Sequence, residues 1–387
     1  MPTRARILRS IAATVATPSL AACGADTASR SSYDSAAASL RRPLEILTER
    51  RAIQRELVRF ATLASSSHNT QCWKFELATN RISILPDFTR RLPAVDPDDH
   101  HLFVSLGAAA ENLVLAGLAV GKRSDVRFDP AGDGAVRIDF ASVPARDSPL
   151  FRAIPHRQCT RASYDGRAIP VNDLRTLELA GSGRGVRVLL QTGRLKMERI
   201  LAYVLRGNTT QMNDPAFLAE LRSWIRFNAT DALATGDGLS SLASGNPQIP
   251  NWLGALAMKL AFTPKSENDK YATSIRSSAG IAVFVSDASD RAHWVETGRC
   301  YERFALQATA LGIRTAMVNQ PVEVAPLRAE FARALDVGRN RPDLVVRFGY
   351  GPEMPQSLRR PVDAVIVGER HASRNVIGAA APVTSDA

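Results

Sequence analysis

The feature that most restricts the fold of this chain is a stretch of twenty residues that occurs twice. Residues 103–122 align without a gap on residues 294–313, at an offset of 191, and six of the twenty positions are identical. Five of the six lie three or four residues apart, which is the spacing of one helix face, and the sixth is a glycine at an expected helix C-cap. The identical pairs are Val104/Val295, Gly107/Gly298, Glu111/Glu302, Leu115/Leu306, Ala119/Ala310 and Gly121/Gly312.

A helix face that occurs twice indicates two copies of one structural unit. Chance similarity between two helices rich in Ala and Leu is the alternative. The remaining sequence fits a duplication, and we expect helices at 44–63, 102–120, 171–180 and 194–206, with strands at 73–77, 81–85, 136–140, 186–191, 281–285 and 343–347. Residues 229–270 are punctuated by Gly and Pro, and we expect them to form an excursion or lid over a cleft.

The size and charge of the chain limit the classes of function. With 387 residues, 45% of them hydrophobic, it can bury a large core. The formal net charge is +11, but basic residues are spread along the sequence and only 6% of residues are aromatic. A nucleic-acid surface needs a basic stripe with interleaved aromatics, so we expect no nucleic-acid partner. The surplus charge favours anionic ligands or membrane surfaces.

The N-terminus is typical of an exported protein. Three arginines precede a weakly apolar run that ends in Leu20-Ala21-Ala22-Cys23, which resembles a bacterial lipobox. We predict that residues 1–23 are an export and lipoprotein signal with Cys23 as the lipidated residue, 24–43 a flexible tether, and 369–387 a disordered tail. The protein would then lie in the cell envelope, anchored to a membrane or periplasmic. An ordinary signal peptide in which Cys23 is incidental is the alternative.

No second membrane segment is expected. The best candidate is 102–120, and Glu111 and Asn112 interrupt it, so we predict no spanning helix. The export route stays open, because the first residues also resemble a twin-arginine signal in which Ala5 replaces the second arginine.

Two short segments suit the two halves of one binding site. Arg157 and Arg161 flank Cys159, and two guanidiniums suit a phosphate because each presents a planar fork of N–H donors. About ninety residues earlier, residues 65–75 offer short polar side chains beside Trp73, which suits a heterocyclic ring. The polar candidates of this segment are Ser66, Ser67, Asn69 and Gln71.

Together these segments resemble the nitroreductase family of flavin enzymes, whose first motif runs approximately Pro-Ser-x-x-Asn-x-Gln-Pro-Trp and whose phosphate motif runs Arg-x-Ser-x-Arg. The resemblance covers about residues 44–366 and implies an α+β fold. Ordinary members are homodimers with FMN at the subunit interface, and the double length here resembles the Acg-type branch, in which one polypeptide forms a pseudo-dimer. We therefore expect one nitroreductase-like half at 44–150, a second at 151–368, and a monomer.

The resemblance implies further contacts to FMN. Arg359 and Arg360, within Ser357–Pro361, match the family's basic pair that closes on the phosphate. Asn319 and Gln320 follow the repeated helix, where the family places a backbone N–H against flavin N5. A fixed donor at N5 shifts the reduction potential of the cofactor.

The motifs predict one flavin per chain. The first half lacks a phosphate motif with the right spacing, since Ser39–Pro43 does not keep it, and Gly181–Gly185 in the second half has no Asn, Gln or Trp. Two departures from the family pattern are Cys72 in place of Pro and Cys159 in place of Ser or Thr. Loss of one hydroxyl donor costs only about 1 kcal/mol, too little to abolish binding.

Neither a dithiol nor a metal site is predicted. After Cys23, the cysteines are Cys72, Cys159 and Cys300, which form no CxxC pair, and we expect all three to be buried and reduced. A metal could bind where His100-His101 follows an acidic run, but Asp-Pro-Asp-Asp also commonly opens a helix. The acidic residues are Asp96, Asp98 and Asp99.

The function that the resemblance implies is an FMN-dependent oxidoreductase. Hydride from a reduced nicotinamide, NAD(P)H, would pass to flavin N5 and then to a small-molecule acceptor of nitroaromatic or quinone type. No catalytic side chain is named, because the cofactor performs the chemistry. The alternative is a non-enzymatic protein that binds and sequesters FMN beneath residues 229–270, and access of nicotinamide to the ring distinguishes the two. A serine hydrolase is disfavoured, because no Gly-x-Ser-x-Gly is present.

Overall fold

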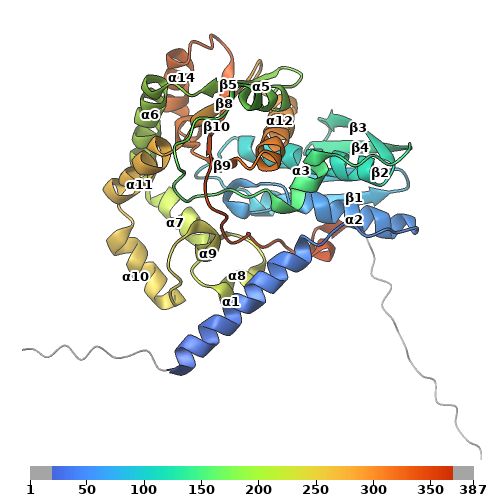
Figure 1. Cartoon of the computed structure of the whole chain (residues 1–387), viewed down its shortest axis with the longest axis horizontal. Coiled ribbons are helices and arrows are strands. Elements are labelled where there is room, and N and C mark those ends of the chain that lie inside the picture. The colour runs from blue at the N-terminus through green and yellow to red at the C-terminus, as the bar shows by residue number, and fades with distance from the viewer. Residues whose placement is uncertain (1–19, 369–387) are drawn as a thin grey trace, which may run out of the picture.

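The computed structural model describes residues 20–368. The predicted export signal before residue 20 and the predicted tail at 369–387 lie outside the described residues. Two largely antiparallel sheets form the body of the molecule, and two long helices cross between them (Figure 1). Antiparallel sheets with separate helices form the α+β class that the sequence predicts.

The first sheet comes mainly from residues 73–142. Its strands are β1 (Trp73–Ala78), β2 (Arg81–Pro86), β3 (Lys122–Asp129), β4 (Ala135–Ser142) and β11 (Ile366–Val367), in the order β11-β1-β2-β4-β3. Helix α2 (Arg50–Thr62) precedes β1, and α3 (His100–Ala119) connects β2 to β3. The Glu49 carboxylate accepts from the N–H groups of Arg51 and Ala52, so α2 begins later than the predicted residue 44.

The second sheet repeats this arrangement. Its strands are β5 (Val186–Gln191), β8 (Gly280–Ser286), β9 (Arg314–Met317) and β10 (Arg341–Gly349), in the order β5-β8-β10-β9. Helix α5 (Val171–Ala180) precedes β5, and α12 (Arg291–Ala310) follows β8. In both sheets the strands follow the order first, second, fourth, third with antiparallel pairing, and a long helix follows the second strand.

The repeated helices α3 and α12 cross in close contact. A Cβ added to Gly107 would lie 1.9 Å from the Val295 carbonyl oxygen, and one added to Gly298 would lie 1.9 Å from the Val104 carbonyl oxygen. Both pairs are equivalent positions of the repeat, so each helix presents the same surface to the other, as in an interface with two-fold symmetry. Glycine is required at both places because the two backbones touch.

Helix α3 is long and apolar enough to cross a bilayer, but 78% of its most apolar window is buried within the protein. Within residues 20–368, α3 is therefore a helix of the protein core. Its neighbour β3 was missed by the sequence reasoning, because charged residues interrupt it and alternate with partly buried ones along the strand. The sequence of such a strand resembles a polar loop, and its partly buried face is recognised only in the assembled sheet.

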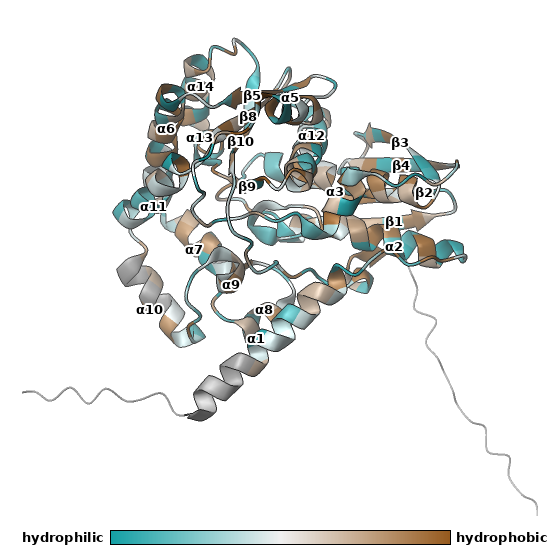
Figure 2. Cartoon of the chain, in the orientation of Figure 1, coloured by the Kyte–Doolittle hydropathy of each residue, from teal (hydrophilic) through white to brown (hydrophobic). Residues whose placement is uncertain are grey.

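A long covering segment lies between β5 and β8 and is larger than the predicted 229–270. Helix α6 (Arg194–Met212) leads into residues 215–276, which we call the lid. The lid contains α7 (Pro215–Trp224), β6 (Ile225–Arg226), α8 (Ala229–Thr235), β7 (Leu239–Ser240), α9 (Ser241–Ser244), α10 (Asn251–Ala261) and α11 (Pro264–Arg276). Figure 2 shows hydrophobic residues on the lid helices α7 and α9.

The predicted flexible tether at 24–43 is wrong over most of its length. Residues Leu20–Leu40 form helix α1, which runs along the lid (Figure 1). Tyr33 is fully buried, and its hydroxyl donates to the Gln356 carbonyl oxygen at 2.8 Å. The segment is rich in Ala, the best helix former, and Tyr33 and Ala37 lie one turn apart to form an apolar face that packs on the lid.

The C-terminal part returns to the first half. After β10 the chain runs across the molecule, and β11 pairs with β1 in parallel, so residues 366–367 belong to the first sheet rather than to the predicted second half. The remaining helices are α4 (Pro149–Ala153), α13 (Gln320–Glu323) and α14 (Ala325–Ala334), with 3-10 turns at Ser67–Asn69, Phe88–Arg90, Ile154–His156 and Val362–Ala364.

Candidate cofactor site

A cavity of about 700 Å³ lies under the lid, with walls from both halves of the chain. Ligand pockets in proteins typically measure roughly 300–1,000 Å³. Nine of the eleven predicted cofactor residues line it: Ser66, Ser67, Asn69, Arg157, Cys159, Arg161, Asn319, Gln320 and Arg359. Gln71 and Arg360 do not.

One end of the cavity is lined by three guanidiniums, those of Arg41, Arg157 and Arg359. Burial, followed by the charge of Arg157, lowers the pKa of Arg41 to about 10. Burial, then Arg41 and Arg157, holds the pKa of Arg359 well below its usual range. The three cations repel one another in a poorly solvated place, and an anion bound among them would relieve that repulsion.

The end of helix α2 and one carboxylate hold Arg157 and Arg359 in place. The Arg157 Nε lies 3.0 Å from a carboxylate oxygen of Glu302, and its Nη2 donates to the Leu63 carbonyl oxygen at 2.7 Å. Arg359 donates to the carbonyl oxygens of Thr62 and Ala64 at 2.6 and 3.0 Å. Cations at a helix C-terminus are stabilised by the helix dipole, so α2 supports a positive wall.

The other arginine of the phosphate motif is free to bind a ligand. Arg161 lines the cavity and is exposed, and within residues 20–368 no hydrogen bond or ion pair occupies its guanidinium. Cys159 is a free thiol, half-buried rather than buried as predicted, because it lines the cavity. The intervening Thr160 N–H donates to the Thr315 carbonyl oxygen at 2.9 Å, which fixes the motif to β9.

The polar loop after α2 is held in an unusual backbone conformation. His68, Asn69 and Gln71 have φ values of 48°, 54° and 53°, in the left-handed region that few side chains adopt. The Gln71 amide donates to the Gly236 carbonyl oxygen at 2.8 Å, and the Asn69 amide donates to that of Gly238 at 3.1 Å. These amides, expected to face a ring, instead connect the loop to the lid.

Arg360 also points away from the cavity. Its backbone N–H donates to the Gln71 side-chain oxygen at 2.8 Å, and its Nη2 donates to the Ala364 carbonyl oxygen at 2.8 Å. The two neighbouring arginines have different partners, and of the two Arg359 alone lines the cavity.

The predicted N5 segment follows the repeated helix α12 as expected, with the strand β9, which the sequence did not predict, between them. The Asn319 side-chain oxygen accepts from the Val345 N–H at 2.9 Å, and the Gln320 amide donates to the Tyr271 hydroxyl at 2.6 Å. Tyr271 belongs to the lid helix α11, so this segment and the lid are also joined.

Several cavity residues were missed by the sequence reasoning. A signal existed for Arg41, since Ser39–Pro43 has the same five residues as Ser357–Pro361, and both segments reach one cavity. The apolar lid wall had no sequence signal because only the fold brings it over the motifs. It consists of Phe217, Leu221, Ile225, Phe227, Leu239, Ile249, Met258 and Phe262, and Met212 at the end of α6 adjoins it.

No model of a protein family matches the sequence. The protein named "Putative NAD(P)H nitroreductase Rv3131" from Mycobacterium tuberculosis H37Rv is 24% identical over 323 residues, which cover 81% of this chain and 90% of that protein. The protein named "Putative NAD(P)H nitroreductase acg" from the same strain is 26% identical over 326 residues, covering 80% and 93%. This chain is similar to nitroreductases along most of its length.

A similar solved structure is the FMN-dependent nitroreductase NfnB from Mycobacterium smegmatis in complex with NADPH. It is 14% identical, covers 59% of this chain and 96% of its own, and has a TM-score of 0.36.

In the second half, the loop Gly181–Gly185 takes the place of the polar loop at 65–75, and it is packed against side chains of α12. A Cβ on Gly183 would lie 2.4 Å from a Glu296 carboxylate oxygen and 2.6 Å from the Cys300 sulfur. The Arg303 guanidinium also lies there and donates to the Ala180 carbonyl oxygen at 3.2 Å. The loop Gly181–Gly185 therefore has side chains where the first loop has a cavity.

Asp96, His100 and His101 could together hold a metal by residue type, since their ligand atoms lie within 4.8 Å of one another and all three are buried. Asp96 accepts from the N–H groups of His101 and Leu102, each at 3.0 Å, so it opens α3 as the sequence predicts. Burial raises the pKa of Asp96 to about 7. His101 also lines the cavity.

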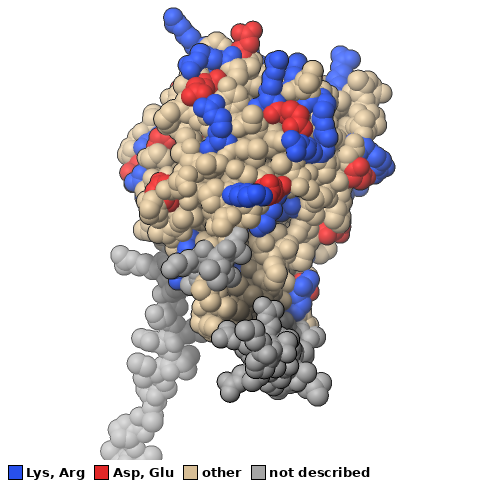
Figure 3. All heavy atoms as spheres, turned by 90° about the vertical axis from the view of Figure 1, so that its left-hand side faces the viewer, with Lys and Arg blue, Asp and Glu red and all other residues tan. Residues whose placement is uncertain are grey.

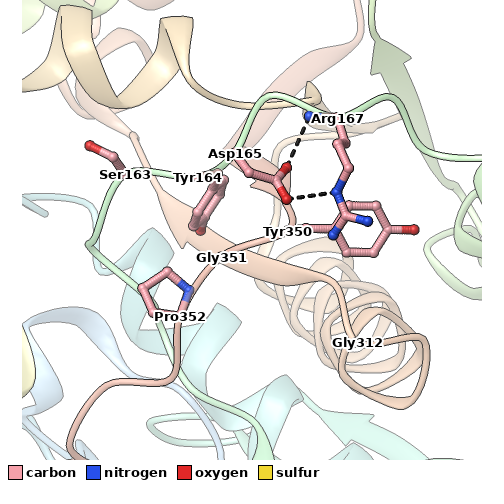
Figure 4. A pocket seen from close by; sticks show the side chains of 8 residues that line it. All are labelled: Ser163, Tyr164, Asp165, Arg167, Gly312, Tyr350, Gly351 and Pro352. Atoms are coloured by element: carbon pink, nitrogen blue, oxygen red, sulfur yellow. Dashed lines mark hydrogen bonds and ion pairs between the residues drawn. The ribbon is translucent and has the colours of Figure 1, made fainter.

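A second hollow of about 490 Å³ contains none of the predicted residues (Figure 4). Among the described residues that line it the one cation is Arg167, which is paired with Asp165 at 2.7 Å and lies 4.4 Å from the centre of the Tyr350 ring. On the face drawn in Figure 3, basic and acidic side chains are intermingled. The cavity under the lid is therefore the best candidate site.

Proposed function

We propose that this protein is an FMN-dependent oxidoreductase of nitroreductase type. It would take hydride from NAD(P)H and pass it to a small nitroaromatic or quinone-like acceptor. The observation that carries the proposal is the cluster of Arg41, Arg157 and Arg359 on one cavity wall, paired with a single buried carboxylate, that of Glu302. The names of the similar mycobacterial proteins support the same reading.

The residues present fit a phosphorylated flavin. Arg161 is free to bind a phosphate, and Arg41, Arg157 and Arg359 add positive charge to the same cavity. The apolar lid wall and the serines at 65–67 offer a mixed surface to a ring. When bound, FMN supplies the hydride chemistry, while the chain orients it and excludes water.

The test is spectroscopic. The purified protein should show flavin absorbance, extraction should yield one FMN per chain, and anaerobic NADPH or NADH should bleach that absorbance. Protein that folds but takes up no FMN when the cofactor is supplied would contradict the proposal.

A second candidate function is FMN sequestration with little turnover. The hydrogen bonds from Asn69 and Gln71 to the lid backbone favour it, because they hold the lid against the loop beside the cavity. The discriminating measurement is the rate of anaerobic flavin reduction at saturating nicotinamide. Reduction over many minutes in protein loaded with FMN favours sequestration, and reduction within seconds favours the enzyme.

We also propose that the two halves are fused copies of one unit and that the protein is a monomer. Their strand orders match and the α3–α12 contact is reciprocal, so the chain already contains the interface that separate copies would form. Light scattering on the full chain with the substitution Cys23→Ser measures the mass, and a stable dimer would contradict the monomer.

We further propose that Cys23 is lipidated and that the protein lies on the membrane in the cell envelope. Leu20–Cys23 has the lipobox pattern, and two acyl chains are enough for stable attachment. Cell fractionation of the parent and of Cys23→Ser, with the intact mass of the mature protein, tests it. A cytoplasmic parent protein that still begins at Met1 would contradict it.

A further inference from the structure

Helix α10 of the lid is apolar on two opposite faces, of which one is exposed. On the inner face Met258 lines the cavity, and a Cβ on Gly254 would lie 2.6 Å from the Phe227 ring. On the outer face Trp252 and Leu256 lie one turn apart and are 76% and 47% exposed. A helix that is apolar all round is normally buried, so we expect a further surface to cover the outer face of α10.

The exposed pair differs from the other apolar residues on the described surface. Within residues 20–368, six large apolar side chains are exposed, and only Trp252 and Leu256 lie one turn apart on a helix. Trp is enriched at membrane–water interfaces, because its amphipathic ring suits the level of the lipid headgroups. The other four exposed residues are Ile46, Val171, Leu179 and Leu195.

Helix α1 holds the predicted lipidation site close to this face. Cys23 lies in the first turn of α1, six residues before Ser29, and a helix rises 1.5 Å per residue, so about 9 Å of helix separates them. The Ser29 hydroxyl lies 3.3 Å from the Thr230 hydroxyl of α8. The next residue, Asp231, accepts from the Asn251 amide of α10 at 2.8 Å. The starts of α1 and α10 are therefore connected through α8.

This geometry keeps the lid close to a membrane that holds Cys23. Figure 1 shows α10 and the N-terminal end of α1 at the same end of the molecule, below the body. The interfacial layer on each side of a bilayer's hydrocarbon core is roughly 5–8 Å thick. A lipid attached about 9 Å of helix from Ser29 therefore holds the lid near the headgroups. A flexible tether would let the body move away from the membrane, whereas a helix packed on the lid does not.

We propose that the outer face of α10 docks on the lipid bilayer that anchors Cys23, with Trp252 and Leu256 inserted among the headgroups. The proposal rests on the lipidation proposed above and goes beyond the redox function. The anchor raises the local concentration of membrane, so two apolar side chains are enough to orient the lid. The chain is basic overall, which adds attraction to anionic headgroups.

Tryptophan fluorescence tests the contact. The wild-type protein, expressed from the full chain, is reconstituted in phosphatidylcholine–phosphatidylglycerol vesicles with or without brominated acyl chains, which quench only rings inside the bilayer. Trp73 and Trp294 are buried within the protein. We expect brominated lipid to quench part of the emission of wild type and of the control Trp224→Phe, and none of that of Trp252→Phe. Equal quenching or no quenching in all three proteins would overturn the proposal.

Binding of the chain without its lipid measures the strength of the contact. In the Cys23→Ser protein, Trp252→Ser should weaken binding to the same vesicles roughly 10- to 100-fold, the contribution of burying one large apolar side chain. Leu195→Ser removes a similarly exposed side chain from α6 and should leave binding unchanged. If the Trp252 and Leu195 variants bind equally well, α10 does not dock on the bilayer.

Further measurements separate this proposal from the earlier ones. If the intact mass shows no acyl groups, the lipidation proposal fails, and the docking stands or falls with the Trp252→Ser comparison. A dimer of Cys23→Ser that Trp252→Ser separates, measured by light scattering without vesicles, would mean that a second copy covers α10 and would refute the docking. Trp252 and Leu256 do not line the cavity, so flavin content should be the same in these variants.

Discussion

The ends of α2 and α5 are equivalent places in the two sheets, yet only the first borders a cavity. At the end of α2, the helix carbonyl oxygens accept from Arg359 and Arg157, and Glu302 of α12 neutralises Arg157. Both arginines come from loops, and they line open space.

At the end of α5, Arg303 donates to the carbonyl oxygens of Ala180 and Ser182, and Glu111 of α3 lies 3.0 Å from both Arg303 and Arg299. Glu111 and Glu302 are identical positions of the repeat. Both arginines here belong to α12 itself, and the side chain of Arg303 fills the space beside the loop with those of Glu296 and Cys300. The same scaffold thus forms a site where loops supply the cations and a packed core where a helix supplies them.

The largest effect is expected where α3 and α12 cross, between the two regions compared above. Gly107→Ala and Gly298→Ala each put a Cβ against a backbone carbonyl, so each should lower the free energy of unfolding by about 3 kcal/mol or more. Gly193→Ala, with no atom near its Cβ, is the control. Chemical denaturation measures all three, and a mild effect at one crossing glycine alone would show that the contact is not reciprocal.

A smaller effect is expected for cofactor binding. Arg161→Ala removes a charge-assisted contact of roughly 1.5–3 kcal/mol and should weaken FMN binding about 10- to 150-fold. Arg184→Ala, an exposed arginine in the equivalent loop, should leave the affinity unchanged. Fluorescence titration with FMN compares them, and equal losses would mean that the Gly181–Gly185 loop binds a flavin too.

The connection between loop and lid gives the next prediction. Gln71→Ala removes hydrogen bonds to Gly236 and Arg360, each contributing about 1 kcal/mol, so amide hydrogen exchange near residue 236 should become several-fold faster. Ser182→Ala in the equivalent loop breaks only a local bond to Glu178 and should leave that exchange unchanged. Unaltered exchange in Gln71→Ala would mean that other contacts hold the lid.

The last effect concerns pH, and it is absent at neutral pH and develops only in acid. Burial, then Arg161 and His101, lowers the pKa of His68 to about 4, against 6.5 in an unfolded chain. The unfolded state therefore binds more protons in this range, and stability should fall as pH decreases from about 6.5 to 4. His68→Asn, which suits the left-handed backbone, should flatten that fall, whereas the exposed His156→Asn should not. Melting temperatures across this range provide the test.

Much of the fold could be read from residue pattern. The repeat predicted the equivalence of α3 and α12, and alternation and glycine breaks predicted β1, β2 and β5 nearly to the residue. Helix α1 was mistaken for a tether, because its one buried face is short and is stabilised by contacts with the lid and with residues 356–358, which are far away in sequence. Local propensity is a weak signal where tertiary contacts provide most of the stability.

For the site, the sequence by itself determined the chemistry, since Arg157, Arg161 and the polar loop are residue types that suit a phosphate and a ring whatever the fold. Tertiary structure alone decided which arginine stays free, which amides are used by the lid, and that Arg41, His101 and Glu323 border the same cavity. The physical reason is that charge and hydrogen-bonding capacity belong to a side chain, whereas burial and partners depend on segments far apart in sequence.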